Sequence, residues 1–351
     1  MQAEFISSDD SRWKDLLKIA DHDLYHLPEY LSLAARHEGG MPCAFWAETA
    51  ESVFLVPLLK RVIPADLKSE YSLCDVFTPY GYPGPILNGN HSEKNIEDIL
   101  QGFFSACRKN GVVSAFWRLH PLLPFPADPL QKLGTLVQHG NTVYIDLSHT
   151  PEQMWQETSN NHRRHIKRLR EHGFVAVRNE WRYWQSFIDA YRENMDRVSA
   201  DGFYFFSNRY FEDLRTTFGE KLDLWTVLSA EGDFAGSMLF TMENGIVQYH
   251  LGGTMTRYMN FSPNKLIIAE ARLCFKKEGH RFLHLGGGLG GATDSLYTYK
   301  ARFSPLSVPF YTFRAVVIAD VYADLTQKRL GKMEAQDSGK MGFFPAYRIP
   351  S

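Results

Sequence analysis

Cations are concentrated in one short segment of the chain. Five Lys or Arg and two His fall within the nine residues 162–170. On a helix, three of these cations would share one face and two would lie about 100° away: Arg163, Lys167 and Arg170, and Arg164 and Arg168. Guanidinium groups present paired donors to phosphate oxygens, so the segment predicts a site for a phosphate or diphosphate. Ile166 and Leu169 mark the side of this helix that we expect to be buried. A solvated helix face without a ligand is the alternative.

Two glycine-rich turns follow predicted strands in the second half of the chain. One contains Gly252–Gly253, and the other has five glycines within residues 286–291. Glycine lets a ligand approach the backbone closely, and a helix N-terminus that follows attracts anions. The residues that we expect to border a ligand here are His250, Asn264, His284, Gly286 and Gly287. Neither turn has the spacing of a P-loop or a dinucleotide fingerprint, so flexible surface loops are the alternative.

An aromatic turn in the first half is a further candidate. Tyr80 and Tyr82 lie in the sequence PYGYPGP, residues 79–85, and Arg118 lies near the end of a predicted strand. Aromatic walls with few polar groups suit small-molecule sites. A packed turn that stabilises a domain edge explains Tyr80 and Tyr82 equally well.

Hydrophobic periodicity predicts the elements that must position these residues. In the first half we expect helices near 12–20, 28–36 and 94–110, and strands near 44–46, 52–61, 73–76 and 112–119. In the second half we expect helices near 151–172, 181–197 and 264–278, and strands near 142–147, 175–178, 222–230, 233–243, 245–252, 282–285 and 310–318. The proline-rich stretch 121–129 is expected to be non-helical. This order predicts an α+β or mixed α/β fold with an internal structural duplication.

Charge changes sign along the chain. The 351 residues carry a formal charge of −2, but residues 1–145 hold 12 basic and 17 acidic side chains, and the remainder holds 26 and 23. The change near residue 145 predicts a domain boundary there. A protein that coats nucleic acid in general would show a strong basic excess overall, so that class is excluded.

Cysteine usage and the chain start predict the compartment. Four scattered cysteines without a C-x-x-C pair fit neither a disulfide framework nor a zinc knuckle: Cys43, Cys74, Cys107 and Cys274. The first residues lack the pattern of a signal peptide, and no stretch approaches the roughly 18 apolar residues of a spanning helix. We therefore expect a soluble protein of the cytoplasm. No hydrolase elbow, zinc-protease, kinase or deaminase motif occurs in the sequence.

Several phrases occur together in a recognisable order. The basic segment NNHRRHIKRLREHGF is followed by YHLGGT, SPNKLIIAEA, FLHLGGG and YTYKARFSP, and YHLPEYL and PYGYPGP precede them all. From about Tyr25 to Phe303, the chain resembles the FemAB-like branch of the GNAT acyltransferase superfamily. The resemblance implies two tandem GNAT-like domains, each a twisted mixed sheet flanked by helices. The first domain would cover residues 1–145, and the tail 316–351 is a candidate to pack back on this domain. The second domain would cover residues 146–315 and would be the catalytic one.

The resemblance also implies a reaction. It implies an N-acyltransferase that moves an acyl group from acyl-CoA or a carrier thioester to an amine of a small molecule or of a surface-polysaccharide or cell-wall precursor. Two alternatives stay open. One is an aminoacyl-tRNA-dependent aminoacyl transferase of the peptidoglycan-bridge type, and the other is a non-catalytic binding protein on a decayed acyltransferase fold. The usual acetyl-CoA loop Q/R-x-x-G-x-G/A is missing, so the donor stays undecided.

The resemblance assigns roles to single residues. It places Lys300 near the reacting carbonyl, with Tyr299 where the family usually has Phe. It places Arg164 on a substrate phosphate, with Lys167 beside it. We also expect Arg163 and Tyr299 to contact the substrate.

We expect no tightly bound cofactor. We also expect no metal, because five adjacent cations surround the paired histidines of the basic segment. Acyl-CoA or aminoacyl-tRNA would be the co-substrate, and the acceptor would be a small molecule or a nucleotide- or lipid-diphosphate-linked one. DNA is not expected as a partner. Peripheral membrane contact and the oligomeric state are left open.

Overall fold

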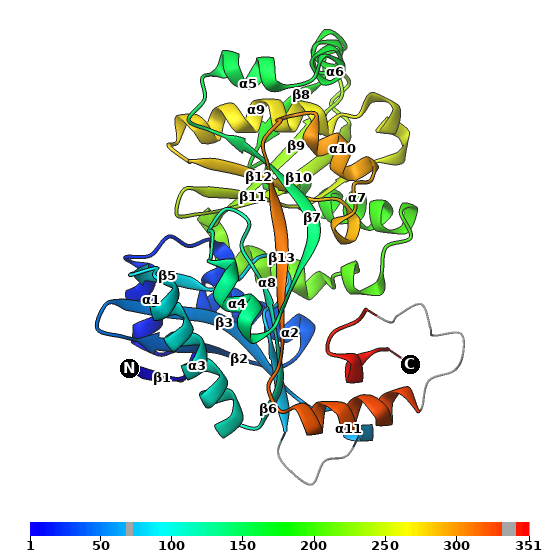
Figure 1. Ribbon diagram of the computed structural model, residues 1–351. Coiled ribbons are helices and arrows are strands. Elements are labelled where there is room, and N and C mark those ends of the chain that lie inside the picture. The colour runs from blue at the N-terminus through cyan, green and yellow to red at the C-terminus, as the bar shows by residue number, and fades with distance from the viewer. Residues whose placement is uncertain (68–72, 332–341, 351) are drawn as a thin grey trace. The chain divides into compact units, whose positions relative to one another are not determined.

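The computed structural model describes residues 1–67, 73–331 and 342–350. The chain forms two compact units (Figure 1). Unit 1 comprises Met1–His139 with Phe310–Ser351, and unit 2 comprises Gly140–Pro309. The predicted assignment of a GNAT-like fold to each half, and of catalysis to the second, stays a prediction.

Unit 1 is built on a mixed sheet. Its strands, in spatial order, are β1 (Gln2–Ser7), β2 (Met41–Glu48), β3 (Ser52–Val62), β4 (Cys74–Phe77), β6 (Val112–Arg118) and β13 (Ser307–Val316), with β5 (Ile86–Gly89) paired to β3. The β4–β6 pair is parallel and the other pairs are antiparallel. The helices are α1 (Ser11–Leu17), α2 (Pro28–Glu38), α3 (Glu93–Lys109), α4 (Ala127–Leu133) and α11 (Ala319–Leu330), with short 3-10 turns η1 (Leu24–His26), η2 (Ala65–Leu67) and η9 (Ala346–Arg348).

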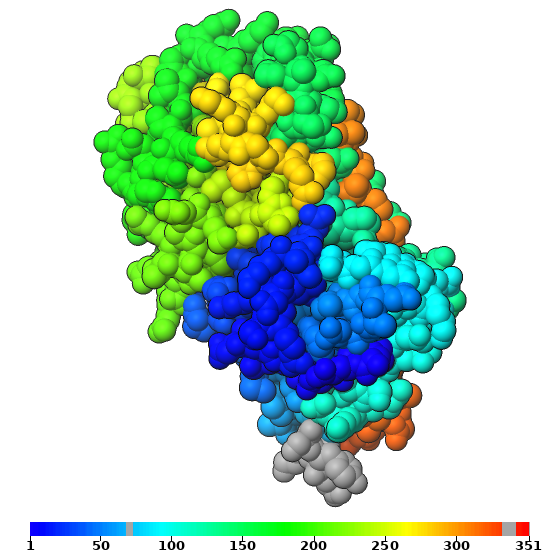
Figure 2. Space-filling view, turned by 90° about the vertical axis from the view of Figure 1, so that its left-hand side faces the viewer, coloured from blue at the N-terminus to red at the C-terminus, as the bar shows by residue number. Residues whose placement is uncertain are grey.

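The core of unit 1 lies between its sheet and α3. Apolar side chains recur along α3 at the spacing of one helix face, and all four are fully buried: Ile96, Ile99, Leu100 and Phe103. They pack against aromatic residues of the sheet, with the Phe103 ring 4.8 Å from that of Trp117. Strand β1 pairs with β2 at the edge of the sheet. It brings the N-terminal residues, blue in Figure 2, to the surface of unit 1.

Unit 2 holds a second mixed set of strands. Their spatial order is β7 (Thr135–Asp146), β12 (Phe282–Gly286), β11 (Ile246–Thr254), β10 (Phe234–Glu243), β9 (Leu222–Leu228) and β8 (Val175–Arg178). Only β11 and β12 form a parallel pair among the pairings described for this unit. The helices are α5 (Pro151–Glu157), α6 (Asn160–Glu171), α7 (Trp184–Arg197), α8 (Asn208–Phe218), α9 (Asn264–Lys277) and α10 (Ser295–Ala301), with 3-10 turns η3 (Trp181–Tyr183), η4 (Gly202–Tyr204), η5 (Gly219–Lys221), η6 (Thr256–Phe261) and η7 (Leu289–Gly291).

The predicted mixed α/β class, with a mixed sheet flanked by helices, is confirmed. The core of unit 2 lies between the sheet and the buried faces of α6 and α9. Ile166 and Leu169 of α6 belong to one hydrophobic cluster with Phe275 of α9. The sequence predicted these two side chains of α6 as the buried side, and both are at most 2% exposed.

Two expectations about helices are wrong. The helix expected over 151–172 is two helices, because Thr158 is extended and the Ser159 side chain caps a new helix by accepting the backbone N–H of His162. The stretch 121–129 contains the start of a helix, because α4 begins at Ala127 with Pro129 in its first turn. A residue in the first turn has no intrahelical acceptor for its N–H, so the missing N–H of proline costs no hydrogen bond there.

Further strands and helices that were not anticipated are β1, β5, α8, α10 and α11. Of these, β1, β5 and α10 have at most seven residues, too few to show a clear period. In the part of the chain that the structure describes, no helix combines the length and apolarity needed to cross a bilayer.

Candidate functional site

The parallel strands β11 and β12 separate after a short pairing. They pair only from Ile246–Phe282 to Gln248–His284. Beyond that point β11 continues along β10 as far as Thr254, while β12 pairs on its other side with β7. The two strands therefore part after Gln248 and His284, and we call this point the gap between β11 and β12.

A β-bulge lies at the point where the strands part. Leu239 of β10 is opposite Leu251 and the next residue, Phe240, is opposite Tyr249, so His250 is the additional residue of β11. A bulge bends its strand and redirects the side chains around it. His250 is buried, its Nε2 lies 3.1 Å from the Tyr210 hydroxyl, and burial lowers its pKa to about 4. His250 is therefore neutral at physiological pH.

Helix α10 places Lys300 at this gap. The ammonium of Lys300 donates to the carbonyl of Gly287 at 2.7 Å and lies 5.7 Å from the centroid of the Tyr249 ring. Its side chain is buried, with 7% exposure, and burial lowers its pKa to about 8 although the nearby Asp294 carboxylate opposes the shift. The structure thus brings together Lys300 and Gly287, which the sequence predicted, and Tyr249, which it did not.

The glycine-rich turn after β12 has a defined conformation. Gly286 has φ +77°, a value that L side chains rarely adopt. A Cβ atom on Gly288 would lie 2.4 Å from the Asp294 carboxylate, which caps α10 by accepting the N–H of Tyr297 and also accepts the N–H of Leu289. The turn is therefore held to the start of α10, and the carbonyl that receives Lys300 is fixed in place.

The α5–α6 junction holds the other end of α10. The last carbonyls of a helix lack partners within it. Here the His162 ring Nε2 donates to the Tyr299 carbonyl at 3.0 Å, the Ser159 N–H to Arg302 at 2.8 Å and the Thr158 hydroxyl to Phe303 at 3.3 Å. His162 is 1% exposed, and burial lowers its pKa to about 4. These three bonds fix the last turn of α10, which carries Lys300.

Tyr299, a predicted substrate contact, lies inside this packing. Its ring centroid is 5.3 Å from that of His162 and 5.5 Å from that of Phe303. Its hydroxyl is buried and has no hydrogen-bond partner among the residues described. Burial, and the neighbouring Tyr249 phenol, raise its pKa, so the hydroxyl stays protonated.

The cations of α6 fall into two groups. Arg163 donates to the Trp155 carbonyl at 3.3 Å and to the Asn160 side chain, and Arg170 pairs with Glu270 at 2.6 Å. The other three are exposed and have no hydrogen-bonded or ion-paired side chain within residues 1–67, 73–331 and 342–350: Arg164, Lys167 and Arg168. Among the predicted contacts, Arg163 is thus committed to the fold, whereas Arg164 and Lys167 are available to a ligand.

Two predicted residues lie deep in unit 2. Asn264 donates to the Gly253 carbonyl at 3.2 Å, which ties the start of α9 to the end of β11. The His284 Nδ1 is 2.6 Å from the Gln248 side-chain oxygen, across the last paired position of the parting strands. Both side chains are buried, so they shape the gap rather than stand free in it.

The remaining candidates lie in unit 1. The Tyr80 backbone is held on both sides, because its N–H donates to the Glu38 carboxylate at 2.8 Å and its carbonyl accepts the Tyr30 hydroxyl at 2.9 Å. The Tyr82 ring packs against His120 and Phe310, with centroids 6.0 and 5.2 Å away.

The turn that carries both tyrosines is rigid. Gly81 has φ +91°, and a Cβ there would lie 2.4 Å from the Tyr25 ring. The Arg118 guanidinium lies 5.8 Å from the Phe116 ring centroid, and the Arg118 backbone N–H donates to the Thr78 hydroxyl at 2.7 Å.

Sequence reasoning missed a buried pair in unit 1. His120 Nε2 lies 2.9 Å from the Asp23 carboxylate, and both side chains are fully buried. His120 Nδ1 accepts the Leu122 N–H at 3.1 Å. The two residues are 97 positions apart, so no local pattern could have indicated the pair.

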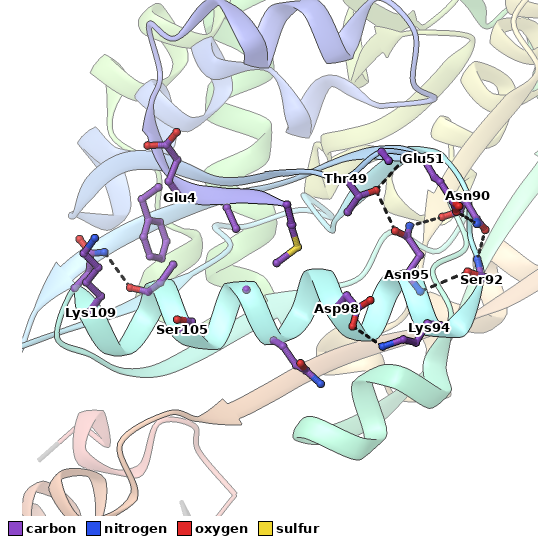
Figure 3. A pocket seen from close by; sticks show the side chains of 18 residues that line it. Glu4, Thr49, Glu51, Asn90, Ser92, Lys94, Asn95, Asp98, Ser105 and Lys109 are labelled. Atoms are coloured by element: carbon purple, nitrogen blue, oxygen red, sulfur yellow. Dashed lines mark hydrogen bonds and ion pairs between the residues drawn. The ribbon is translucent and has the colours of Figure 1, made fainter.

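A wide polar cavity of about 1300 Å³ also lies in unit 1, between β1, α3 and the turn before β3 (Figure 3). Several of its amide and hydroxyl groups are engaged with one another, since Asn95 donates to Ser52 and to the Asn90 carbonyl at 2.7 Å and accepts from Thr49 at 3.1 Å. None of the predicted site residues lines it. These bonds hold the neighbouring turns, and we assign the cavity no chemistry.

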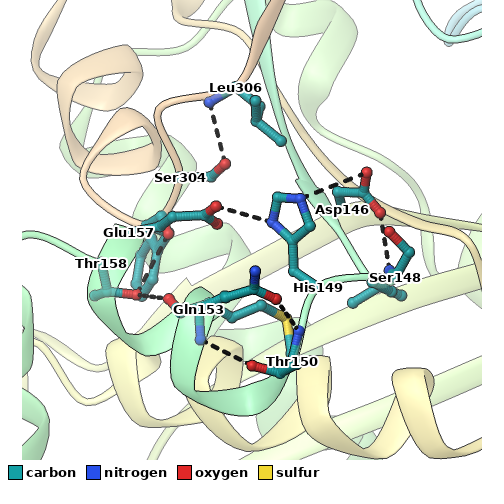
Figure 4. Close-up of polar contacts among 12 residues, drawn as sticks. Asp146, Ser148, His149, Thr150, Gln153, Glu157, Thr158, Ser304 and Leu306 are labelled. Carbon is teal, nitrogen blue, oxygen red and sulfur yellow. Dashed lines mark hydrogen bonds and ion pairs between the residues drawn. The ribbon is translucent and has the colours of Figure 1, made fainter.

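A polar cluster surrounds His149 in unit 2 (Figure 4). The His149 Nδ1 lies 2.8 Å from Glu157, and its Nε2 lies 4.0 Å from Asp146. Ser304 is nearby, but its hydroxyl is buried and accepts the Leu306 N–H at 3.1 Å. No hydrogen bond joins Ser304 to His149 in the described chain, so the cluster is not an assembled nucleophile–base pair.

Residues 156–301 match the family described as Acetyltransferase (GNAT) domain. This segment is therefore similar to GNAT acetyltransferase domains. The matched segment holds α6, the parting strands, α9 and α10 up to Lys300. No sequence among the curated proteins matches this chain.

Solved structures share the fold over nearly the whole chain. FemX is 11% identical with a TM-score of 0.69, and the match covers 92% of this chain and 99% of FemX. The C-terminal domain of a protein assigned as a lysylphosphatidylglycerol synthetase, from Agrobacterium fabrum, is 12% identical with a TM-score of 0.55, covering 90% and 93%. L-PGS from Bacillus licheniformis is 12% identical with a TM-score of 0.53, covering 94% and 99%. At these identities the likeness shows the fold, and the predicted resemblance to the FemAB-like GNAT branch is confirmed.

Proposed function

We propose that this protein is an N-acyltransferase that joins an acyl group from an activated thioester to an amine, with the reaction in the gap between β11 and β12. The GNAT domain and the fold support acyl or aminoacyl transfer as the general reaction. The observation that carries the proposal is the buried ammonium of Lys300, fixed at 2.7 Å from the Gly287 carbonyl beside the parting strands.

The proposed chemistry needs a cation at the acyl oxygen. The acceptor amine attacks the thioester carbonyl, a C–N bond forms, the C–S bond breaks, and the amine proton passes to the leaving thiolate through water. Negative charge develops on the acyl oxygen before the thiolate leaves. One proton of Lys300 is engaged with Gly287, so the others are available to the oxyanion. A well-placed donor of this kind stabilises the transition state by about 2.7–4 kcal/mol.

The acceptor proposed is an amine on a small molecule or on a surface-polysaccharide or cell-wall precursor, linked to a nucleotide or lipid diphosphate. The exposed cations of α6 support this class, because Arg164 and Lys167 have no carboxylate partner within the described ranges.

A second candidate is aminoacyl transfer. The fold shared with the protein assigned as a lysylphosphatidylglycerol synthetase supports it, together with the basic surface of α6. The donor would then be an aminoacyl ester, and the same Lys300 position would serve the same oxyanion.

A donor panel tests both proposals. Binding of acetyl-CoA and longer acyl-CoAs, of nucleotide-linked amino sugars, and of aminoacyl-tRNA is measured by the shift of the melting temperature, because a ligand that binds only the folded state raises it. Turnover is then assayed with each donor that binds. A CoA thioester that raises the melting temperature and is consumed supports the first proposal. Binding of aminoacyl-tRNA that weakens steeply with salt supports the second, and a protein that binds none of these ligands is not this transferase.

Replacement of Lys300 tests its role. We expect Lys300→Met to lower kcat by roughly a hundredfold or more with little change in KM, because the interaction is made only in the transition state. Lys277→Met, at the exposed end of α9, is the matched control and should keep full activity. Unchanged turnover in the Lys300 variant would remove that residue from the mechanism.

A further inference from the structure

Tyr249 lies at the point where the parallel strands of unit 2 part. Its neighbour Gln248 is the last residue of β11 that pairs with β12, and the bulge at His250 follows directly. The centroid of its ring is 5.9 Å from that of Phe240 and 5.7 Å from the Lys300 ammonium. The ring therefore packs on the core of unit 2 and lies beside the cation that we place at the acyl oxygen.

Gly252 makes room for the hydroxyl of Tyr249. A Cβ atom on Gly252 would lie 2.5 Å from this oxygen and 3.0 Å from the ring carbon Cε2. Non-bonded carbon atoms prefer a separation of about 3.5–4.0 Å, so a larger residue would displace the hydroxyl. The sequence predicted that a glycine here lets a ligand approach the backbone, but the close approach at Gly252 is made by a side chain of the protein itself.

The hydroxyl of Tyr249 has no hydrogen-bond partner in the part of the chain that the structure describes. Other tyrosines of unit 2 are engaged, since the Tyr191 hydroxyl donates to the Tyr204 carbonyl at 2.7 Å and the Tyr258 hydroxyl to Asp233 at 3.1 Å. Burial raises the pKa of Tyr249 to about 12, so its hydroxyl stays protonated at physiological pH and can donate. A polar group withdrawn from water without a partner is costly and rare, so this hydroxyl indicates a bound acceptor.

Lys300 likewise offers donors without an acceptor. An ammonium has three N–H groups, and Lys300 uses one of them on the Gly287 carbonyl. No carboxylate pairs with Lys300 within the described ranges, and the nearby Asp294 carboxylate accepts backbone N–H groups of its own turn. Neighbouring side chains of β11 and α10 thus offer donors at the gap for which the described protein has no acceptor. This arrangement is complementary to an oxygen on which negative charge develops.

We propose that Tyr249 is a catalytic residue whose hydroxyl is the second hydrogen-bond donor, beside Lys300, to the acyl oxygen of the thioester. The inference rests on the proposed function, since it concerns the carbonyl that reacts at the gap. When the amine attacks and the C–N bond forms, the carbonyl π electrons move to the oxygen and both hydrogen bonds strengthen. When the C–S bond breaks, the electrons return and both donors keep their protons. The amine proton still passes to the thiolate through water, so Tyr249 is unchanged at the end of the reaction.

The two donors differ in their pH dependence. Lys300 loses its proton as the pH rises through about 8, whereas Tyr249 keeps its proton up to about pH 12. Loss of the hydroxyl should therefore lower the rate at every pH at which the enzyme is active, without moving the alkaline fall that Lys300 causes.

Tyr249→Phe tests the proposal because it removes only the hydroxyl oxygen. With the donor that the protein consumes, we expect kcat to fall roughly ten- to a hundredfold, KM to change by less than about threefold, and the alkaline fall to stay near pH 8. The melting temperature should not decrease, because the hydroxyl makes no bond in the described fold, whereas a structural hydroxyl would lower it on removal. Tyr183→Phe is the matched control, since Tyr183 is a half-buried tyrosine of η3 that packs on Phe234, and it should keep full activity.

Gly252→Ala tests the position of the hydroxyl separately. The added Cβ would displace the Tyr249 oxygen, so this change should lower kcat in the otherwise unaltered protein and have a clearly smaller effect in the Tyr249→Phe background. Losses that add fully would contradict the placement of the hydroxyl at the reacting oxygen.

Full turnover by Tyr249→Phe, or a rise in KM with unchanged kcat, would overturn the proposal. An enzyme that loses activity in Lys300→Met but keeps it in Tyr249→Phe refutes the role of Tyr249 alone. Loss of activity in Tyr249→Phe with full activity in Lys300→Met refutes the role of Lys300 alone. A protein that transfers no acyl group from any donor refutes the proposed function, and the role of Tyr249 with it.

Discussion

Lys300 has two properties that a surface lysine lacks. It is 7% exposed, and its pKa is lowered to about 8, chiefly by burial. If the ammonium stabilises an oxyanion, only the protonated enzyme is active. We expect kcat/KM to fall as the pH rises through about 8, because the lysine then loses its proton.

Lys300→Arg provides the control for this pH profile. Arginine stays charged over the accessible range, so the alkaline fall should vanish even though the geometry is less favourable and the rate lower. An alkaline fall that persists in the Lys300→Arg variant would assign the titration to another group. A rate that rises through pH 8 would instead indicate that neutral Lys300 acts as a base.

The same burial predicts a cost in stability. The pKa of Lys300 falls from 10.5 to about 8 on folding, so below pH 8 the folded state holds a charge that the unfolded state accommodates better. We expect Lys300→Met to raise the free energy of unfolding at pH 7 by roughly 1–3 kcal/mol. The gain should shrink between pH 8 and 10.5 and vanish above that range. Urea denaturation at pH 7 and pH 10 measures it, and a variant less stable at pH 7 would contradict the prediction.

At the scale of elements, α10 is positioned from both ends. Asp294 caps its start and holds the glycine-rich turn, and the α5–α6 junction bonds its last carbonyls. The break between α5 and α6 therefore positions α10: a continuous helix over 151–172 would not direct Thr158, Ser159 and His162 toward it.

His162→Phe should weaken this arrangement. Phenylalanine fills the space between Tyr299 and Phe303 but leaves the buried Tyr299 carbonyl without its donor, at a cost of about 1–3 kcal/mol. We expect a lower kcat with little change in KM, because Lys300 is displaced, and a lower free energy of unfolding. His162→Gln restores an N–H donor and should recover part of both losses. His172→Phe, on the last exposed turn of α6, is the control.

At the scale of the whole chain, residues near the C-terminus complete the core of unit 1. Tyr347 is fully buried, its hydroxyl lies 2.7 Å from that of Ser114, and it donates to Asp75 at 3.3 Å. It packs in one cluster with residues of η2, β6 and α11. Segments more than 200 residues apart in sequence therefore share one small core.

Tyr347→Ala should cost unit 1 about 3–5 kcal/mol, the usual range for removal of a buried aromatic side chain. Tyr347→Phe keeps the packing and loses the two hydroxyl bonds, so about 1–2 kcal/mol is expected. Phe343→Ala removes an aromatic ring that is 47% exposed and serves as the control. Denaturant unfolding followed by circular dichroism measures all three, and equal effects of Tyr347→Ala and Phe343→Ala would contradict the assignment of Tyr347 to the core.

The sequence by itself determined the mixed α/β class, the order of most strands and helices, and the buried side of α6. These follow from local periodicity, which records which residues leave water but not which elements they meet. Local periodicity gave the wrong helix boundaries at Thr158 and Pro129. At these positions the local backbone geometry, a helix cap after Thr158 and a first helical turn at Pro129, decided where the helices begin and end.

Only the tertiary structure decided which candidates form a site. It alone set Tyr249 beside Lys300 and separated β11 from β12. It also engaged Arg163 and Arg170 with partners and brought Lys265 to His165. The His165–Lys265 contact joins residues 100 positions apart, and the His162–Tyr299 bond joins residues 137 apart. Residue type and spacing determine the chemical group of each side chain and the helix or strand face on which it lies. The burial and neighbouring charges that shift its pKa come from residues distant in sequence, which only the fold brings near.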